Sequence, residues 1–311
     1  MLLDSTQKNN GRTLKKIASF LSVSLAVFLS VIKFLASIST GSLSILSSMI
    51  DSIADVLASA ITFIAIRYST KPASRDFRYG YGKIEALSSF LQALFITGSG
   101  LFILYDGISR FFKPKELDDS FLGITIMLIS LTLTISLVAF QKYVVRKTNS
   151  LALRGDSLHY ITDIGTNMSV IIALIIIKIT GITWIDSVVA IGIAAYLIHT
   201  AYILARDAVC MLMDQELGDD IKEDVEKIIL SEPYVKGMHD LRTRSLGEND
   251  LFEFHLELDP NISLVAAHNH AHQVEAKIHQ KYPDAQVIIH QEPEGAKEFH
   301  LDKQIELSKE R

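Results

Sequence analysis

The chain has 311 residues, 49% of them hydrophobic, with a formal net charge of −5 and a mean hydropathy of +0.29. These averages hide a division. Long apolar runs fill the chain up to about residue 208, whereas 22 acidic and 11 basic residues follow that position. Eight of the ten histidines lie in the same acidic part. The composition excludes a wholly soluble protein and gives no indication of a nucleic-acid partner. It predicts a membrane domain followed by an acidic, histidine-bearing soluble domain.

Six apolar segments are long enough to cross a hydrocarbon core of about 30 Å, which takes about 20 helical residues. They comprise residues 14–38, 43–66, 84–109, 119–141, 151–179 and 184–206. Basic residues are concentrated before the first segment and in the second and fourth loops, which the positive-inside rule assigns to the cytoplasm. With an even number of spans, both termini are expected there. We therefore predict a six-helix membrane domain at residues 14–208, preceded by a cytoplasmic segment at residues 1–13.

Ionisable residues interrupt two of these segments at helical spacing. Asp51 and Asp55 lie in the second segment, and His159 and Asp163 lie in the fifth. Residues four apart project from one helix face. A charged side chain at the bilayer centre costs at least about 2.5–3.5 kcal/mol on insertion scales, so such residues usually pair, bind an ion or transfer protons. Three carboxylates and one imidazole suit tetrahedral zinc or a similar divalent cation. We therefore predict a metal-transport site between these two helices.

Other residues of the membrane domain have simpler interpretations. Lys33, near the end of the first segment, is expected to extend its ammonium group to the membrane surface. His199 lies singly near a helix end, and a structural role is expected for it. Leu158, next to His159, is a candidate apolar gate. The single cysteine, Cys210, excludes both an intramolecular disulfide and a zinc site built from several thiolates.

Residues 209–292 have the pattern of a small α+β domain. The expected order is helix, strand, strand, helix and strand, at residues 219–230, 235–245, 251–258, 263–281 and 285–290. This αββαβ order suggests a three-stranded sheet with both helices on one face. The remaining residues, 293–311, are expected to form a flexible charged tail.

Histidines occur at informative places in this domain. His239, His255 and His290 fall on predicted strands that would be sheet neighbours, and Glu292 follows the last of them. His268 opens the second predicted helix. Surface histidines are common in soluble domains, and that interpretation is preferred for His270, His272, His279 and His300. Several histidines on adjacent strands beside a carboxylate instead predict a metal cluster.

Five motifs, taken in this order and at these intervals, resemble the cation diffusion facilitator family, in its bacterial ferrous-iron and zinc efflux branch. They are TGSLSILSSMIDSIAD, GKIEAL, LHYITD, MHDLRTRS and IIHQEP. The resemblance covers about residues 14–292. It implies a homodimer in the bacterial inner membrane, with six transmembrane helices and a ferredoxin-like cytoplasmic domain in each subunit. It also implies exchange of a cytoplasmic divalent cation for protons by alternating access.

The resemblance further implies roles for individual residues. Asp51, Asp55, His159 and Asp163 match the transport site of the family. Lys83 and Asp214 match a charge pair that ties the membrane domain to the soluble one. A cytoplasmic binuclear metal site at the dimer interface matches His239, His255, His268, His290 and Glu292.

One departure from the family concerns the loop between the second and third helices. Relatives build a third metal site there from one aspartate and two histidines. Ser74, Phe77 and Tyr81 occupy the matching positions of this chain, with Asp76 nearby. We therefore expect no metal site in this loop.

The predicted function is efflux of zinc, with ferrous iron and cadmium as other substrates that the same donor atoms accept. A metal ligand set needs a neutral imidazole and ionised carboxylates, so binding should release protons, which is a route to antiport. Two alternatives stay open. An intramembrane metallohydrolase would need a vacant ligand position and a general base, and no HExxH arrangement is present. A membrane-anchored metal sensor or store would leave the carboxylates of the membrane helices unexplained. We therefore predict a transporter rather than an enzyme, with bound zinc also in the cytoplasmic domain.

Overall fold

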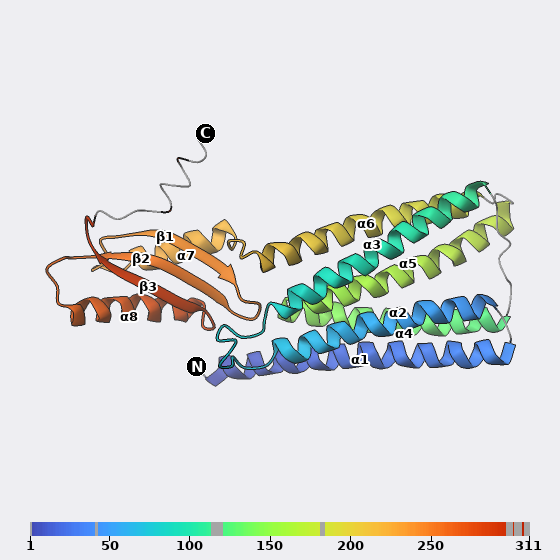
Figure 1. Ribbon diagram of the computed structural model, residues 1–311, viewed down its shortest axis with the longest axis horizontal. Coiled ribbons are helices and arrows are strands. Elements are labelled where there is room, and N and C mark those ends of the chain that lie inside the picture. The colour runs from blue at the N-terminus through green and yellow to red at the C-terminus, as the bar shows by residue number, and fades with distance from the viewer. Residues whose placement is uncertain are drawn as a thin grey trace. The chain divides into compact units, whose positions relative to one another are not determined.

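The computed structural model describes residues 2–40, 43–112, 121–180 and 184–296, together with Leu301 and Leu307 (Figure 1). Side chains are not described at residues 2–8, 36–37, 39–51, 110–112, 121–124, 126–127, 169–180 and 184–186. The chain divides into two compact units. The first comprises Met1–Asp76 and Lys83–Val209, and the second comprises Phe77–Gly82 and Cys210–Arg311. The predicted tail at 293–311 lies for the most part outside the described residues.

Six long helices make up the described part of the first unit. They are α1 (Leu2–Thr40), α2 (Leu43–Ser69), α3 (Ile84–Phe112), α4 (Phe121–Thr148), α5 (Leu151–Thr180) and α6 (Trp184–Leu212). The shortest has 27 residues, which corresponds to about 40 Å of helix and exceeds the thickness of a hydrocarbon core. The six predicted segments therefore correspond to six helices, most of which run beyond the predicted ends.

Five of these helices carry a described stretch that is apolar enough to cross a membrane, namely α1, α2, α3, α4 and α6. The fifth helix differs because the first half of α5 contains Arg154, Asp156 and Asp163. Its second half is apolar in sequence, but those side chains lie outside the described residues. The structure thus gives six helices of sufficient length, of which five also qualify by composition.

Small side chains lie between the helices, and large apolar side chains face outward. Ala93 of α3 and Ala201 of α6 are buried in one apolar cluster, whereas Phe102 of α3 is 70% exposed. Gly100 marks the closest approach, since a Cβ there would lie 2.9 Å from Cγ1 of Ile198. Membrane bundles use small residues in this way because close packing replaces the hydrophobic driving force that lipid removes.

Glu85 ties several helices of the first unit together. Its carboxylate accepts hydrogen bonds from Lys15 of α1 at 3.0 Å and from Ser69 of α2 at 2.9 Å through Oε1, and from Ser150 at 2.5 Å through Oε2. Glu85 is buried, so these three donors replace the water that its charge has lost. The glutamate of the GKIEAL motif therefore has a structural role, which is to hold neighbouring helices of the first unit together.

The second unit contains a three-stranded sheet and two helices. Its elements are α7 (Asp219–Leu230), β1 (Gly237–Ser245), β2 (Asp250–Leu258), α8 (Leu264–Lys281) and β3 (Gln286–Pro293). The strands lie in the order β1-β2-β3, with β1 antiparallel and β3 parallel to β2. The predicted αββαβ order is confirmed. Ser263 caps α8 by accepting a hydrogen bond from the backbone N–H of Ala266 at 3.2 Å.

Alternation along β2 separates the two faces of this sheet. Phe252 and Phe254 are fully buried, and they share one apolar cluster with Ile229 of α7 and Val274 of α8. Both helices therefore cover the same face, as the sequence predicts. Side chains at the intervening positions of β2, which include His255, point to the opposite face. That opposite face is where the histidines of the strands meet.

Residues 77–82, which precede α3, pack within the second unit. A Cβ at Gly82 would lie 2.0 Å from the carbonyl oxygen of Leu246, and Gly247 has a φ of +104° beside it. The guanidinium of Arg244 lies 5.5 Å from the centre of the Tyr79 ring. Two glycines are needed because two backbones meet there without room for side chains.

Asp224 links α7 to the end of α8, and we expect the stability that this contact contributes to depend on pH. It accepts hydrogen bonds from Lys281 and, at 2.8 Å, from the hydroxyl of Tyr282. The bond from Lys281 and then that from Tyr282 lower the pKa of Asp224 below its ordinary value. A carboxyl group with a lowered folded pKa stabilises the fold above its unfolded pKa of about 3.9, and that contribution is lost as the pH falls through the folded pKa.

We therefore expect Asp224→Asn to remove part of the acid dependence of the α7–α8 contact. Hydrogen exchange of α7 and α8 in the full-length protein, corrected for intrinsic rates between about pH 6 and pH 3, measures this dependence. Glu223→Gln is the matched control, because Glu223 pairs with Lys227 on the exposed face of one helix. An identical acid dependence in the two variants would contradict the assignment.

Candidate metal centres

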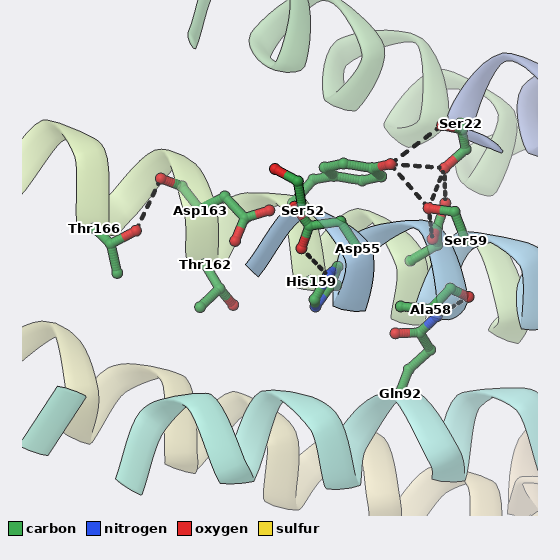
Figure 2. Close-up of polar contacts among 12 residues, drawn as sticks. Ser22, Ser52, Asp55, Ala58, Ser59, Gln92, His159, Thr162, Asp163 and Thr166 are labelled. Carbon is green, nitrogen blue, oxygen red and sulfur yellow. Dashed lines mark hydrogen bonds and ion pairs between the residues drawn. The ribbon is translucent and has the colours of Figure 1, made fainter. Parts of the chain in front are cut away.

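Asp55 of α2 meets His159 and Asp163 of α5 inside the first unit. His159 Nε2 lies 3.1 Å from Asp55 Oδ1, and the three residues offer ligand atoms that all lie within 4.8 Å of one another. Figure 2 shows the three side chains facing one another between the two helices. His159 is 5% exposed. The spacing in the sequence placed His159 and Asp163 on one face, and the packing of α2 against α5 brings Asp55 to that face.

Asp51 lies one turn before Asp55 on α2, and its side chain lies outside the described residues. Its part in the site stays a prediction. Ser52, which follows it, is buried beside Asp55 (Figure 2).

The surroundings of His159 fit a metal ligand. One ring nitrogen faces Asp55, and the other, Nδ1, is buried without a hydrogen-bond partner among the described residues. The nitrogen that faces Asp55 lies among carboxylates, and an imidazole together with carboxylates is a preferred donor set for zinc.

A second polar cluster lies one helical turn before His159, around the fully buried Asp156. Its carboxylate accepts hydrogen bonds from Ser22 of α1 at 2.5 Å, Ser59 of α2 at 3.3 Å and Gln141 of α4 at 2.7 Å. The Tyr160 hydroxyl lies 2.8 Å from Ser59 Oγ. These contacts join α1, α2 and α4 to α5 next to the site, and so fix the helix that carries His159.

Sequence reasoning did not single out Asp156. The signal was available, because Asp156 is a further ionisable residue in the same apolar segment, three residues before His159. Its partners are serines and a glutamine from three other helices, and only the packing reveals them.

The gate candidate Leu158 does not face the same partners as His159, which follows it in the chain. It packs against the apolar cluster formed by Ala93 and Ile96 of α3 and Leu197 of α6. Its role as a gate stays a prediction.

The strand register brings three histidines of the second unit side by side. His239 pairs with His255 across β1 and β2, and His255 pairs with His290 across β2 and β3. The ring centres lie 4.9 Å apart in the first pair and 4.7 Å apart in the second. The proximity expected from the sequence is therefore present.

Glu292 completes a compact group with two of these histidines. His239 Nε2 lies 2.7 Å and His255 Nδ1 lies 3.4 Å from Glu292 Oε1, and the three residues offer ligand atoms within 4.8 Å of one another. Glu292 is 5% exposed. Glu257, which sequence reasoning missed, lies 3.1 Å from His239 Nδ1 and orients that ring. Its position two residues after His255 on one strand face was the available signal.

His268 is not brought to this group within one chain. It lies on α8, which packs on the helix-covered face of the sheet, and its ring lies 4.9 Å from that of His272. His290 adjoins His255 at the edge of the group. The five predicted ligands thus form one compact trio, one adjoining histidine and one histidine on a helix.

The remaining predicted residues fall outside these groups. In the loop after α2, the rings of Phe77 and Tyr81 lie 4.9 Å apart, and neither offers an imidazole. Lys83 and Asp214 belong to different units, so their pairing stays a prediction. Within the second unit, Asp214 accepts a hydrogen bond from Arg244 at 3.0 Å.

Comparisons with known proteins agree along the chain. Residues 19–213 match the model of the cation efflux transmembrane domain, and residues 217–294 match that of the cation efflux protein cytoplasmic domain. The cation-efflux pump FieF of Shewanella oneidensis is 41% identical over 278 residues, which cover 89% of this chain and 94% of that protein. FieF of Klebsiella pneumoniae subsp. pneumoniae is 38% identical over 281 residues, which cover 89% and 92%. Among solved structures, the metal-bound C-terminal domain of the CzcD transporter from Thermotoga maritima is 28% identical to the matched part of this chain. The match covers 25% of this chain and 93% of that domain, with a TM-score of 0.25.

The histidine group on the sheet predicts metal bound outside the first unit. Replacing His239, His255 and His290 together by alanine should remove that metal, because the compact group loses both of its imidazoles. Elemental analysis of the purified full-length protein after zinc loading measures the number of ions per chain.

The matched control replaces His270, His272 and His279 of α8 by alanine, which removes the same number of histidines from the same unit. An equal loss of zinc in the two triple variants would contradict a specific site on the strands.

Proposed function

Because this chain belongs to the cation efflux family, whose members are also called cation diffusion facilitators, we propose that it exports a divalent metal cation from the cytoplasm in exchange for protons. The observation that carries the proposal is the convergence of Asp55, His159 and Asp163 inside a bundle of membrane-length helices. Asp51 would supply the fourth donor from the turn before Asp55.

The donor atoms indicate the class of cation. Imidazole nitrogen with carboxylate oxygen suits zinc, and it also accepts ferrous iron and cadmium. Four protein donors would complete a tetrahedral shell, whereas a catalytic zinc centre keeps one position for water or substrate. This donor set therefore favours a site that binds and releases a metal ion, and not a catalytic centre that acts on a substrate.

Proton exchange follows from the protonation states that a metal requires. Binding needs a neutral His159 and ionised carboxylates, so a metal entering the site displaces protons. Protons arriving from the more acidic side of the membrane reverse the reaction and expel the metal. The site thus uses one set of atoms for both ions.

Alternating access is supported by the placement of the donors on two separate helices. Asp55 belongs to α2, and His159 and Asp163 belong to α5, so a change in the tilt of one helix against the other alters access to the site. Leu158 lies on the same turn of α5 and is the proposed apolar gate.

We also propose a homodimer in the bacterial inner membrane, with both termini in the cytoplasm. Within one chain, α8 places His268 on the face of the sheet opposite the compact group of His239, His255 and Glu292. His268 would therefore reach such a group only in a second copy of the chain. Zinc held there would stabilise the contact between the two copies, and would act as a structural or regulatory ion.

Ligand substitutions test the transport site. Asp51→Ala, Asp55→Ala, His159→Ala and Asp163→Ala should each abolish zinc flux into proteoliposomes, because each removes one bond and disturbs the charge balance of the site. His199→Ala is the control, since this exposed histidine of α6 lies outside the site. Size-exclusion chromatography verifies that each variant remains a folded dimer.

Flux at the level of the His199→Ala control in any ligand variant would refute the site. The same assay separates the alternative functions. A sensor or store would bind zinc without flux, and a metallohydrolase would change a substrate.

Proton release tests the exchange mechanism. In a variant that lacks His239, His255 and His290, binding of zinc should release about one to two protons per ion between about pH 6 and pH 7.5. Calorimetry in buffers of different ionisation enthalpy counts these protons directly. A count near zero would remove antiport, even if the metal site itself were retained.

A further inference from the structure

Lys33 brings a positive charge into the apolar part of α1, within the stretch Asn9–Leu35 that qualifies as a membrane span. The sequence suggested that its side chain extends to the membrane surface. The structure shows a different direction, because Lys33 Nζ donates a hydrogen bond to Ser52 Oγ of α2 at 2.7 Å. Ser52 is 1% exposed, so the ammonium is directed into the bundle.

The position of Ser52 places this ammonium next to the candidate transport site. Ser52 directly follows Asp51 and precedes Asp55 by three residues, which corresponds to about 4.5 Å along the axis of α2. Among the side chains that the structure describes, a neutral hydroxyl receives the ammonium. Asp55 is therefore within about one helical turn of the residue that receives the ammonium.

Two contacts between α1 and α2 define the side of the site on which Lys33 lies. Ser22 meets Ser59, and Lys33 meets Ser52, so the two helices run antiparallel. Asp55 lies between Ser59 and Ser52 along α2. Lys33 is therefore on the opposite side of the site from the Asp156 cluster, toward the beginning of α2. With the proposed cytoplasmic termini, this is the side away from the cytoplasm.

The ammonium of Lys33 and a bound metal cation carry charge of the same sign, and both are attracted to the carboxylates of the site. A site of three carboxylates and one imidazole carries excess negative charge when it is empty and ionised, and a divalent cation neutralises most of it. A lysine ammonium is a compact, mobile point charge on a flexible stem. Held by Ser52 about one helical turn from Asp55, it stabilises the empty site and repels a bound cation.

We propose that Lys33 is a tethered counter-ion that competes with the transported cation for the carboxylate of Asp55 and so promotes its release on the far side. The inference rests on the transport function proposed above and adds a residue from α1 that sets the affinity of the site. Lys33 acts through Asp55 and does not bind the cation.

Three substitutions separate the charge of Lys33 from its hydrogen bond. Lys33→Gln keeps a donor for Ser52 and removes the charge, Lys33→Arg keeps the charge, and Lys33→Met removes both. Each is made in the variant that lacks His239, His255 and His290, so that calorimetry with zinc chloride reports the membrane site. Flux in proteoliposomes supplies the KM and the maximal rate.

We expect Lys33→Gln and Lys33→Met to bind zinc about tenfold more tightly than the parent, and to show a lower KM together with a lower maximal rate, since one nearby like charge is gone. Lys33→Arg should retain the affinity and the rate of the parent. A merely structural hydrogen bond predicts the opposite order, with Lys33→Gln unchanged and Lys33→Met impaired without tighter binding.

An unchanged zinc affinity in Lys33→Gln would overturn the inference. That outcome is distinct from failure of the proposed function, which shows as undiminished flux in Asp55→Ala. If Asp55→Ala abolishes flux while Lys33→Gln binds as the parent does, the transport site stands and the counter-ion role fails.

Discussion

Polar groups in the first unit must find their partners inside the protein, because a bilayer core offers no water to replace them. The contact between Asp55 and His159 is the central case, since each of these side chains would be costly to bury alone. The neighbouring helices are positioned by the same requirement. Along α2 from Ser69 back to Ser52, polar contacts to other helices join Ser69 to Glu85, Ser59 to Asp156, Asp55 to His159 and Ser52 to Lys33. The candidate metal site is formed at one of these contacts, between Asp55 and His159.

In the second unit, one sheet must supply both an apolar face for the core and a polar face for the histidines. The alternation of a strand gives each face of the sheet its own composition. On β2, phenylalanines on one face fill the core beneath α7 and α8, whereas His255 on the other face joins His239 and Glu292. The core and the candidate metal-binding group are therefore interleaved in sequence and separated in space. A shift of one residue in register would exchange them.

Much of this arrangement could be predicted from the sequence, because it depends on local periodicity. The six long helices, the αββαβ order and the proximity of three histidines follow from spacing along the chain. The partners of Asp156 and Glu257 and the direction of Lys33 could not be predicted, because each depends on a residue from another element. His268 shows the same limit, since a motif match does not tell on which face of the sheet a helix lies.

The close approach of Gly82 to Gly247 has a mechanical consequence. Residues 77–82 pack within the second unit, yet the chain enters them from α2 and leaves them into α3. The backbone therefore crosses between the units at three places, and α3 begins two residues after Gly82. Any rearrangement of the hairpin between β1 and β2 thus acts, through its backbone contact with Gly82, on a segment that continues directly into the start of α3.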